Sequence, residues 1–429
     1  MKQSLYNILI PYTDDRMVLF NGISKRFFFI SNNNADELEE VMSDVRVYEK
    51  DSRYSNLINI LKKNGFIVNI EKDERVMLEN MYYRYRDSQS YSLLILSTYS
   101  CNFSCWYCVQ KHNASFLNDI IVKKIYKHIE QYLHTKNISS FHISWFGGEP
   151  LLNFEKVKDI CRFSKDLCHK FNIAYSNGIT TNASLISRDM AKEMRILSFK
   201  NFQITIDGDK ESHNKTRYNS IYPDSFSTIL NNITMLVEEI PNADIAIRFN
   251  YTKNNLSPSL PEDVDKIIGK VKQNVKLLFR KVWQEENTIE LNKMLRDIII
   301  KFSNMGYEFL HEYDDMKLTS CYVEKRHYNA IFPDGTVDKC SNRDMSLTRG
   351  ELFDNGNIVW HNTPKEIDIN IFSTKSDCYD CRYLPLCLGP CPRSRENVEM
   401  TSGIKCVYPN KDFTFFENIK NYVTFKHTK

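Results

Sequence analysis

Three cysteines in the first quarter of the chain, Cys101, Cys105 and Cys108, are close enough in sequence to present three thiolates from one tight loop. A closed iron–sulfur cube or a structural zinc site takes four protein ligands. A cluster held by three cysteines therefore keeps one iron open for another ligand. A zinc knuckle or three unrelated core cysteines would show similar spacing, so the loop alone does not identify the metal.

The element that positions this loop is the short apolar segment 93–98, which predicts a buried strand ending just before the cysteines. From about residue 90 such segments alternate with helical patterns, and the stripe 121–133 is apolar at every fourth residue. Repeated strand–helix units predict an α/β fold, a partial (β/α)6 TIM-like barrel with ligand groups at the carboxyl ends of its parallel strands. Further strands are expected at 141–146, 178–182, 202–207, 245–249 and 275–279, and helices near 155–170, 187–198, 225–238 and 262–272.

Polar motifs stand at the ends of these predicted strands. In Gly147-Gly148-Glu149-Pro150 the two glycines would let the backbone approach a ligand closely, and the carboxylate accepts hydrogen bonds from an amine. Arg217 lies shortly after the strand 202–207, and a guanidinium fork suits a carboxylate. Taken alone, the first motif is a turn and the second a surface arginine.

The cysteine loop, with Tyr107 before its third cysteine, and the Gly-Gly-Glu-Pro turn about forty residues later resemble the radical S-adenosylmethionine (radical SAM) enzymes. The resemblance implies a cluster whose open iron binds the amino and carboxylate groups of SAM, and reductive cleavage of SAM to a 5′-deoxyadenosyl radical. It assigns the amino group to the turn and the carboxylate to Thr205 and Arg217, and it implies an external electron donor such as flavodoxin or ferredoxin. The cofactor-binding residues implied are Gly147, Gly148, Glu149, Thr181, Asn182, Thr205, Arg217 and Arg248.

Seven further cysteines occupy the last third of the chain in the pattern C-x13-G-x4-C … C-x2-C-x5-C-x3-C-x14-C. This pattern resembles the SPASM domain, which implies two auxiliary [4Fe–4S] clusters and three in all; zinc ribbons are the alternative for the C-x2-C pair. The fourth ligand of the nearer cluster is left open between His327, a free iron position and a substrate group. The resemblance assigns Cys321, Cys340 and Cys391 to the nearer cluster, and Cys378, Cys381, Cys387 and Cys406 to the outer one.

Residues 1–85 carry no catalytic signature. Short strands are predicted at 18–20 and 26–30 around a turn at Asn21-Gly22, followed by a helix with Leu57, Ile60 and Leu61 on one face, ended by Gly65, and a strand at 66–68. The pattern resembles the winged-helix-like (α+β) domain of peptide-modifying radical SAM enzymes, which implies that it binds the leader of a precursor peptide as an added strand. A stabilising extension would look much the same.

Composition sets the broad class. At 429 residues the chain is expected to hold three domains, at 1–85, 90–310 and 311–429. A net charge of +3 gives no support for nucleic acid or a membrane surface as partner, and no apolar signal or span predicts export. The expected compartment is the cytoplasm, where twelve cysteines indicate metal ligation rather than disulfides. Cys161 and Cys168 lie outside the motifs and are expected to be buried thiols.

The resemblance as a whole implies an oxidoreductase that modifies a residue of a ribosomally made precursor peptide, most simply by a C–C, C–S or C–O crosslink. Epimerisation is not excluded by the sequence. The alternative is an anaerobic sulfatase-maturing enzyme, which makes formylglycine. Such enzymes begin almost directly at the cysteine loop and place a general-base aspartate where this chain has Ser341. A non-catalytic metal- or nucleic-acid-binding protein is the alternative from another class, and it predicts zinc and no SAM cleavage.

Overall fold

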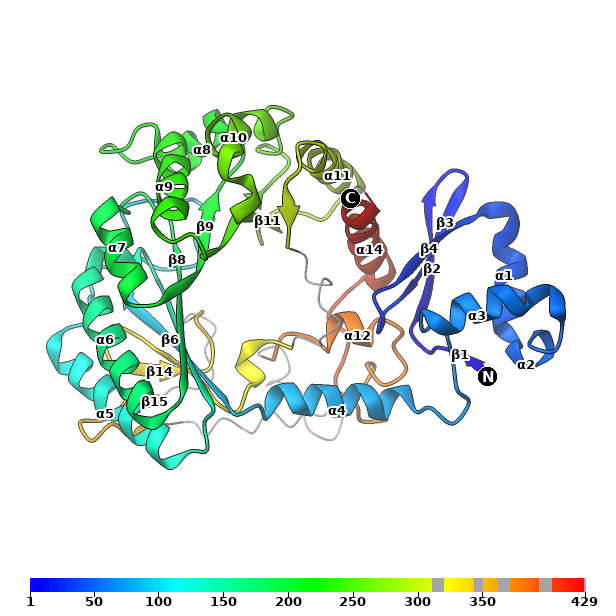
Figure 1. The fold of residues 1–429 in the computed structure, drawn as a ribbon, viewed down its shortest axis with the longest axis horizontal. Coiled ribbons are helices and arrows are strands. Elements are labelled where there is room, and N and C mark those ends of the chain that lie inside the picture. The colour runs from blue at the N-terminus through cyan, green and yellow to red at the C-terminus, as the bar shows by residue number, and fades with distance from the viewer. Residues whose placement is uncertain (311–319, 343–349, 362–370, 393–402, 428–429) are drawn as a thin grey trace. The chain divides into compact units, whose positions relative to one another are not determined.

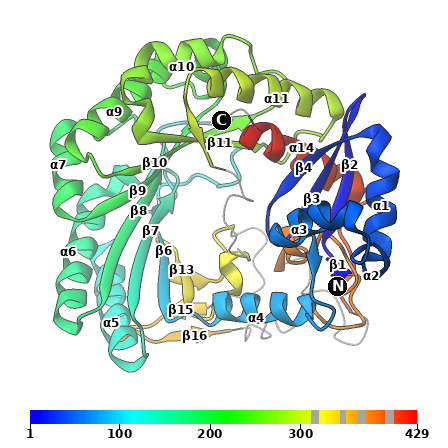
Figure 2. The ribbon, with the colours of Figure 1, turned by 45° about the vertical axis from the view of Figure 1, so that its right-hand side comes forward.

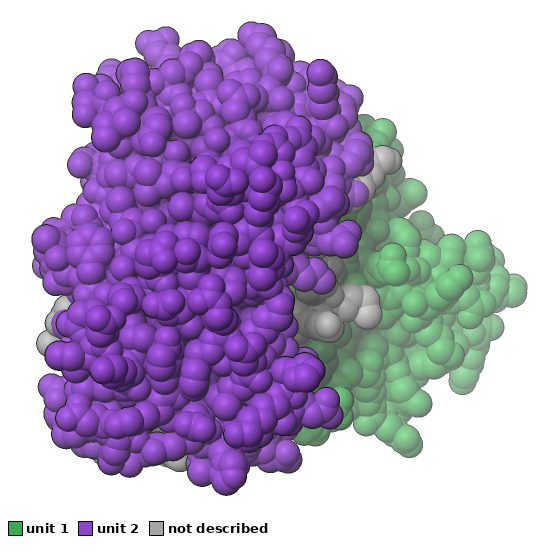
Figure 3. All heavy atoms as spheres, turned by 60° about the vertical axis from the view of Figure 1, so that its left-hand side comes forward, with its two compact units in different colours: residues 1–87, 311–324, 366–427 green, residues 88–310, 325–365, 428–429 purple. Residues whose placement is uncertain are grey.

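The computed structural model describes residues 1–310, 320–342, 350–361, 371–392 and 403–427. The chain forms two compact units, coloured separately in Figure 3. Unit 1 comprises residues 1–87, 311–324 and 366–427, and unit 2 comprises residues 88–310, 325–365 and 428–429. This grouping by contacts divides the region predicted as a C-terminal domain, 311–429, between the two units.

Unit 2 is built on parallel strands that neighbour one another in chain order, each of the strands β6 to β11 followed by a helix. The helices cover the outer side of these strands in Figures 1 and 2. The predicted succession of parallel βα units is therefore confirmed. The strands are β6 (Ser90–Thr98), β7 (Ser140–Gly147), β8 (Ala174–Thr181), β9 (Phe199–Ile206), β10 (Asp244–Tyr251), β11 (Val275–Lys281) and β12 (Glu308–Phe309). The helices are α5 (Asp119–Thr135), α6 (Phe154–Phe171), α7 (Arg188–Ile196), α8 (Lys210–Thr216), α9 (Ser225–Glu239), α10 (Leu260–Ile268) and α11 (Ile289–Asn304).

The core of unit 2 follows from the periodicity of its sequence. In β7 every second residue is buried, with Phe141, Ile143 and Trp145 at 0–1% exposure, as expected where alternate side chains of a strand face the helices. The apolar stripe of α5 is buried along its length, as the fourfold spacing predicts. Cys161 and Cys168 are both fully buried in α6, as expected for thiols outside the motifs.

Four short strands extend the parallel sheet beyond β6, and sequence analysis did not predict them. They are β13 (Tyr328–Ile331), β14 (Thr336–Asp338), β15 (Gly350–Leu352) and β16 (Ile358–Trp360). β13 pairs parallel with β6, and the others continue antiparallel, giving a sheet of eleven strands in the part of the chain that the structure describes. Strands of three or four residues are too short to show an alternating pattern, which is why periodicity missed them.

Unit 1 contains a three-stranded antiparallel sheet of order β2-β3-β4 and a second small sheet of β1 with β5. The turn at Asn21-Gly22 and the helix end at Gly65, whose φ is +83°, lie where they were predicted. The predicted helix face is wrong at one position, because Ile60 is 40% exposed and Ile58 is buried instead. The strands are β1 (Lys2–Gln3), β2 (Asn7–Thr13), β3 (Arg16–Asn21), β4 (Phe27–Ser31) and β5 (Ile67–Val68). The helices are α1 (Ala35–Ser43), α2 (Val45–Tyr48), α3 (Ser55–Lys63), α4 (Glu74–Arg86), α12 (Leu384–Cys387) and α14 (Lys411–His427).

The hydrophobic cores of unit 1 combine N-terminal and C-terminal residues. One core joins β2 and β3 to α12 and α14, with Phe20 packed edge-on against Tyr422 at a centroid distance of 5.9 Å. Another joins Leu78 and Tyr82 of α4 to the segment that carries Cys378. Within the described residues, no helix is long and apolar enough to cross a membrane.

Candidate functional site

The cysteine loop begins where β6 ends. The Thr98 hydroxyl donates to the Ser115 carbonyl at 2.7 Å and accepts from the Ser100 amide at 2.9 Å, which fixes the path of the chain as it leaves the strand. Phe103, between the first and second cysteines, is 1% exposed and anchors the loop in the core. Hydrogen bonds of the Thr98 hydroxyl to the backbone and one buried ring therefore hold a loop that is otherwise irregular.

The three thiols of the loop differ in exposure. Cys101 and Cys105 are half-buried and Cys108 is exposed, with its Sγ 3.5 Å from Nε2 of His112. Burial raises the pKa of Cys101 to about 12. Nowhere in the described parts of the chain do three His, Cys, Asp or Glu side chains form a group that could hold a metal ion. The donors match a three-cysteine cluster in number and chemical type, although their sulfur positions do not form a closed group.

The turn after β7 packs directly on this loop. The amides of Gly148 and Glu149 donate to the carbonyls of Thr98 and Ser100 at 3.0 and 2.8 Å. A Cβ atom at Gly147, whose φ is +128°, would lie 2.3 Å from the Thr98 carbonyl oxygen, and one at Gly148 would lie 2.1 Å from that of Ser100. Both glycines are therefore required by the contact between the strand end and the loop.

The carboxylate of Glu149 is 0% exposed and accepts hydrogen bonds from neighbouring backbone and side-chain groups. Its Oε1 accepts from the Leu151 amide at 3.0 Å and the Thr181 hydroxyl at 2.7 Å, and its Oε2 accepts from the Asn182 amide at 2.7 Å. Burial raises the pKa of Glu149, and these hydrogen bonds oppose the rise. The Asn182 side chain in turn donates to Asn102 at 2.8 Å, so the ends of β7 and β8 and the cysteine loop are linked.

Arg217, at the end of α8, lies in a buried ion pair. Its Nε donates to Oδ2 of Asp207 at 2.7 Å, and its Nη2 donates to the Tyr107 hydroxyl at 2.8 Å. Asp207 is 0% exposed and Arg217 7% exposed. Tyr107 belongs to the cysteine loop, so this pair joins the end of β9 to the loop. Thr205, two residues before Asp207 on β9, is also buried.

Arg248 joins the same cluster from β10. Its Nε donates to Asn250 at 2.8 Å, and the Asn250 amide donates to the Tyr107 hydroxyl at 3.1 Å. Burial lowers the pKa of Arg248, and the nearby positive charge of Arg280 lowers it further. The predicted residues of unit 2 are thus brought to one end of the parallel sheet.

Sequence analysis gave no role to three residues of this cluster, Tyr107, Asp207 and Asn250. The signal for Asp207 was present, because an acid directly after a buried strand lies at the ligand-bearing edge of a parallel sheet. Nothing in the sequence pairs it with Arg217 rather than with solvent. Tyr107 was noted only as an aromatic neighbour of the third cysteine.

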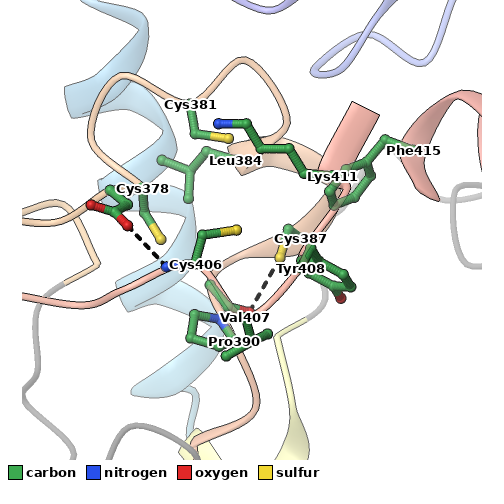
Figure 4. A pocket seen from close by; sticks show the side chains of 12 residues that line it. Cys378, Cys381, Leu384, Cys387, Pro390, Cys406, Val407, Tyr408, Lys411 and Phe415 are labelled. Carbon is green, nitrogen blue, oxygen red and sulfur yellow. Dashed lines mark hydrogen bonds between the residues drawn. The ribbon is translucent and has the colours of Figure 1, made fainter. Parts of the chain in front are cut away.

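Four cysteines of unit 1 line a single cavity. Cys378, Cys381, Cys387 and Cys406 border a space of about 370 Å³ that includes open solvent, together with Leu384 and Phe415. Figure 4 shows the four side chains around this space, with the Cys406 amide donating to Asp377 at 3.0 Å. Burial raises the pKa of Cys387 to about 12. The four thiols match a four-ligand site in number and type, although the sulfurs do not close into a metal-holding group in the described structure.

The three cysteines predicted for the nearer auxiliary cluster belong to different units. Cys321 and Cys391 are exposed residues of unit 1, and Cys340 follows β14 in unit 2. Nδ1 of His327 lies 2.8 Å from the Tyr132 hydroxyl of α5. The backbone carbonyl of Ser341 accepts from Gln110 of the segment after the cysteine loop at 3.3 Å. Ligation by these cysteines and by His327 stays a prediction.

Comparison with known proteins finds similarity to one superfamily over part of the chain. Residues 95–253 match the model of the radical SAM superfamily. The chain is 30% identical over 163 residues to a cysteine-type anaerobic sulfatase-maturating enzyme of Clostridium novyi, a match that covers 34% of this chain and 41% of the relative. It is 24% identical over 270 residues to the radical SAM cyclopropyl synthase TigE of Paramaledivibacter caminithermalis, covering 52% and 55% of the two chains. The chain thus spans about half the length of these two relatives.

Two solved structures share the fold. Native anSMEcpe with bound AdoMet superimposes with a TM-score of 0.56 at 21% identity, covering 79% of this chain and 97% of that one. SuiB of Streptococcus suis bound to the precursor peptide SuiA superimposes with a TM-score of 0.51 at 15% identity, covering 95% of this chain and 100% of that one. Residues 95–253, which carry the cysteine loop and its polar cluster, are the part of the chain that matches the radical SAM superfamily.

Proposed function

We propose that this protein is a radical SAM maturase that oxidatively modifies, most simply by crosslinking, a residue of a ribosomally synthesised precursor peptide. The observation that carries the proposal is the extent of the fold match. The likeness to SuiB, solved with a precursor peptide, covers 95% of this chain, whereas the likeness to anSMEcpe covers 79%. The fold shared with SuiB therefore takes in more of the chain than the fold shared with anSMEcpe.

A radical SAM domain implies one [4Fe–4S] cluster and SAM, which together supply a carbon radical able to take hydrogen from an unactivated C–H bond. We assign that cluster to the cysteine loop of unit 2. We further assign two auxiliary clusters to the remaining seven cysteines of the motif, because four of them already line one cavity. A flavodoxin or ferredoxin is the proposed electron donor.

The polar cluster of unit 2 would orient the SAM amino acid. Glu149 and Arg217 are buried groups of opposite charge, and both act electrostatically on Cys101. An α-amino acid is a zwitterion, so a buried anion and a buried cation that both act on the same cysteine suit its ammonium and its carboxylate. Phe103 is buried, and the turn at Gly148 packs against the backbone of the loop.

The sheet of unit 1 offers an edge for the leader peptide. Among the described residues, β4 pairs only with β3, so its other edge has unused backbone donors and acceptors. The opposite edge strand, β2, contains Pro11, which lacks a backbone donor. Strand addition to β4 is therefore the binding mode we propose.

The test uses the anaerobically reconstituted protein with SAM, a reductant and a short peptide encoded beside its gene. We expect 5′-deoxyadenosine and a peptide that has lost two hydrogens. The second candidate, sulfatase maturation, is favoured by the 30% identity to the Clostridium novyi enzyme. A sulfatase peptide whose cysteine loses its sulfur and becomes formylglycine would establish that function instead. Zinc content without 5′-deoxyadenosine would indicate a non-catalytic protein.

A further inference from the structure

Asp207 is the fully buried centre of the polar cluster, and the proposed function as stated gives it no task. Its side chain is 0% exposed, and its Oδ2 accepts from Nε of Arg217 at 2.7 Å and from the Tyr107 hydroxyl at 2.5 Å. A buried carboxylate is costly unless it is paired and hydrogen-bonded. The cost is offset here by a contact that also fixes a guanidinium.

The contact determines which end of Arg217 remains for a ligand. Nε is engaged by Asp207 and Nη2 by Tyr107, while no hydrogen bond within the described residues engages Nη1. A guanidinium is planar and rigid, so holding its Nε side fixes the direction in which its opposite end points. Tyr107 strengthens the hold, because its hydroxyl donates to Asp207 and accepts from Arg217 and Asn250.

The charges around Arg217 favour an anion. Arg248 is a second, half-buried cation of the cluster, and its partial burial, together with the positive charges of Arg280 and Arg217, lowers its pKa. Asp207 is the acid that pairs with Arg217, and its Oδ1 is buried without a hydrogen-bond partner in the described structure. Within the described residues Asp207 pairs with Arg217, and the Glu149 carboxylate is hydrogen-bonded by backbone amides and Thr181, so the Nη1 end of Arg217 can still bind a ligand carboxylate.

We propose that Asp207 is a positioning residue, which holds Arg217 so that its Nη1 end receives the carboxylate of an α-amino acid, here the methionyl part of SAM. The inference rests on the proposed function, since it takes SAM to be the ligand. It adds that Asp207 acts through Arg217 and touches neither the ribose nor the adenine. Tyr107 is the second positioning residue, acting through the same two partners.

Two nucleoside probes separate this role from a general one. S-adenosylhomocysteine carries the α-amino acid, and 5′-methylthioadenosine has the same nucleoside thioether without it. We would measure binding of both to the reconstituted protein by anaerobic calorimetry, for Asp207→Asn, Tyr107→Phe and the control Asp244→Asn. Asp244 makes an exposed ion pair with Lys276 in the same sheet and is remote from the cluster in sequence and contacts.

We expect Asp207→Asn to weaken the binding of S-adenosylhomocysteine by roughly ten- to a hundred-fold, the size expected when a charge-assisted hydrogen bond that orients the binding group is weakened. Its binding of 5′-methylthioadenosine should stay within about twofold, and Tyr107→Phe should show a smaller effect of the same kind. In a protein that already carries Arg217→Ala, Asp207→Asn should not weaken the binding of S-adenosylhomocysteine any further.

The proposal would be overturned if Asp207→Asn weakened the binding of both probes equally or of neither. It would also be overturned if Asp207→Asn still weakened the binding of S-adenosylhomocysteine in the Arg217→Ala background. If Asp207→Asn does not fold, Tyr107→Phe decides by the same ratio of affinities. A wild-type protein that binds neither probe would refute the proposed function. A wild-type protein that binds both probes, together with an Asp207 variant that binds them as tightly as the wild type, would refute only the role of Asp207.

Discussion

Replacing Leu78 by alanine should loosen the four-cysteine cavity, although the two are far apart in sequence. Leu78 of α4 is 0% exposed and packs in one hydrophobic core with Leu384, Leu388 and Cys378. The cysteine-bearing segment therefore takes part of its core from the N-terminal segment. If these two segments unfold as one cooperative unit, the space left by the leucine side chain destabilises the core. The population of an open form from which metal can leave then rises.

The magnitude follows from the burial. A fully buried leucine replaced by alanine costs about 2–5 kcal/mol. Since 1.36 kcal/mol corresponds to a factor of ten, the open form becomes roughly thirty to several thousand times more populated. Metal release that passes through this form should accelerate by the same factor, provided that closing is fast compared with chelation.

The assay is loss of cluster absorbance under anaerobic chelator, alongside denaturant unfolding of the same samples. Val76→Ala is the matched control, because Val76 lies on the same helix and is 50% exposed, so its effect should stay within about 0.5 kcal/mol. A Leu78→Ala protein that unfolds more easily but releases iron at the wild-type rate would refute a shared cooperative unit. The background for this assay carries alanine at Cys101, Cys105, Cys108, Cys321, Cys340 and Cys391, which leaves iron only in the cavity.

Three further outcomes test the site and the sheet. Replacing Cys101, Cys105 and Cys108 together by alanine should remove about a third of the iron and all 5′-deoxyadenosine formation; a triple variant that still makes 5′-deoxyadenosine would contradict the assignment. Gly148→Ala places a Cβ 2.1 Å from a carbonyl oxygen of the loop and should lower SAM cleavage at least tenfold with unit 1 unfolding unchanged, as followed by denaturant titration. Burial lowers the pKa of His128 to about 4, so the unfolded chain takes up a proton near its ordinary pKa of 6.5 before the folded one does. Unfolding free energy should therefore fall by about 2 kcal/mol between pH 7.5 and 5, and His128→Gln should lose that part of the slope.

The regular elements of unit 2 were predictable because their signal is local. Buried strands of eight or nine residues and helices of nine to eighteen carry enough periodicity to be read from one sequence, as at β7 and α6. The failures are at contacts between distant segments. Nothing local in the sequence of α14 indicates that it covers β2 and β3, and nothing local in α3 indicates that Ile58 rather than Ile60 faces the core.

The same distinction applies within the site. Sequence reasoning found the residue types that suit SAM, and it attributed the two glycines to close approach of a ligand. The structure shows that a Cβ at Gly147 would first meet the backbone at the end of β6, and one at Gly148 the backbone of the cysteine loop. Likewise, the Glu149 carboxylate makes three hydrogen bonds to its own chain. These residues hold the loop in place, and any ligand must be bound in addition to these internal contacts.

A motif whose members hold one another in place tolerates less substitution than one whose members each touch a ligand separately, because a single change displaces the others. Asp207 shows the consequence most directly, since it accepts from Arg217 and from a tyrosine of the cysteine loop, so one buried acid sets both the cation and the loop.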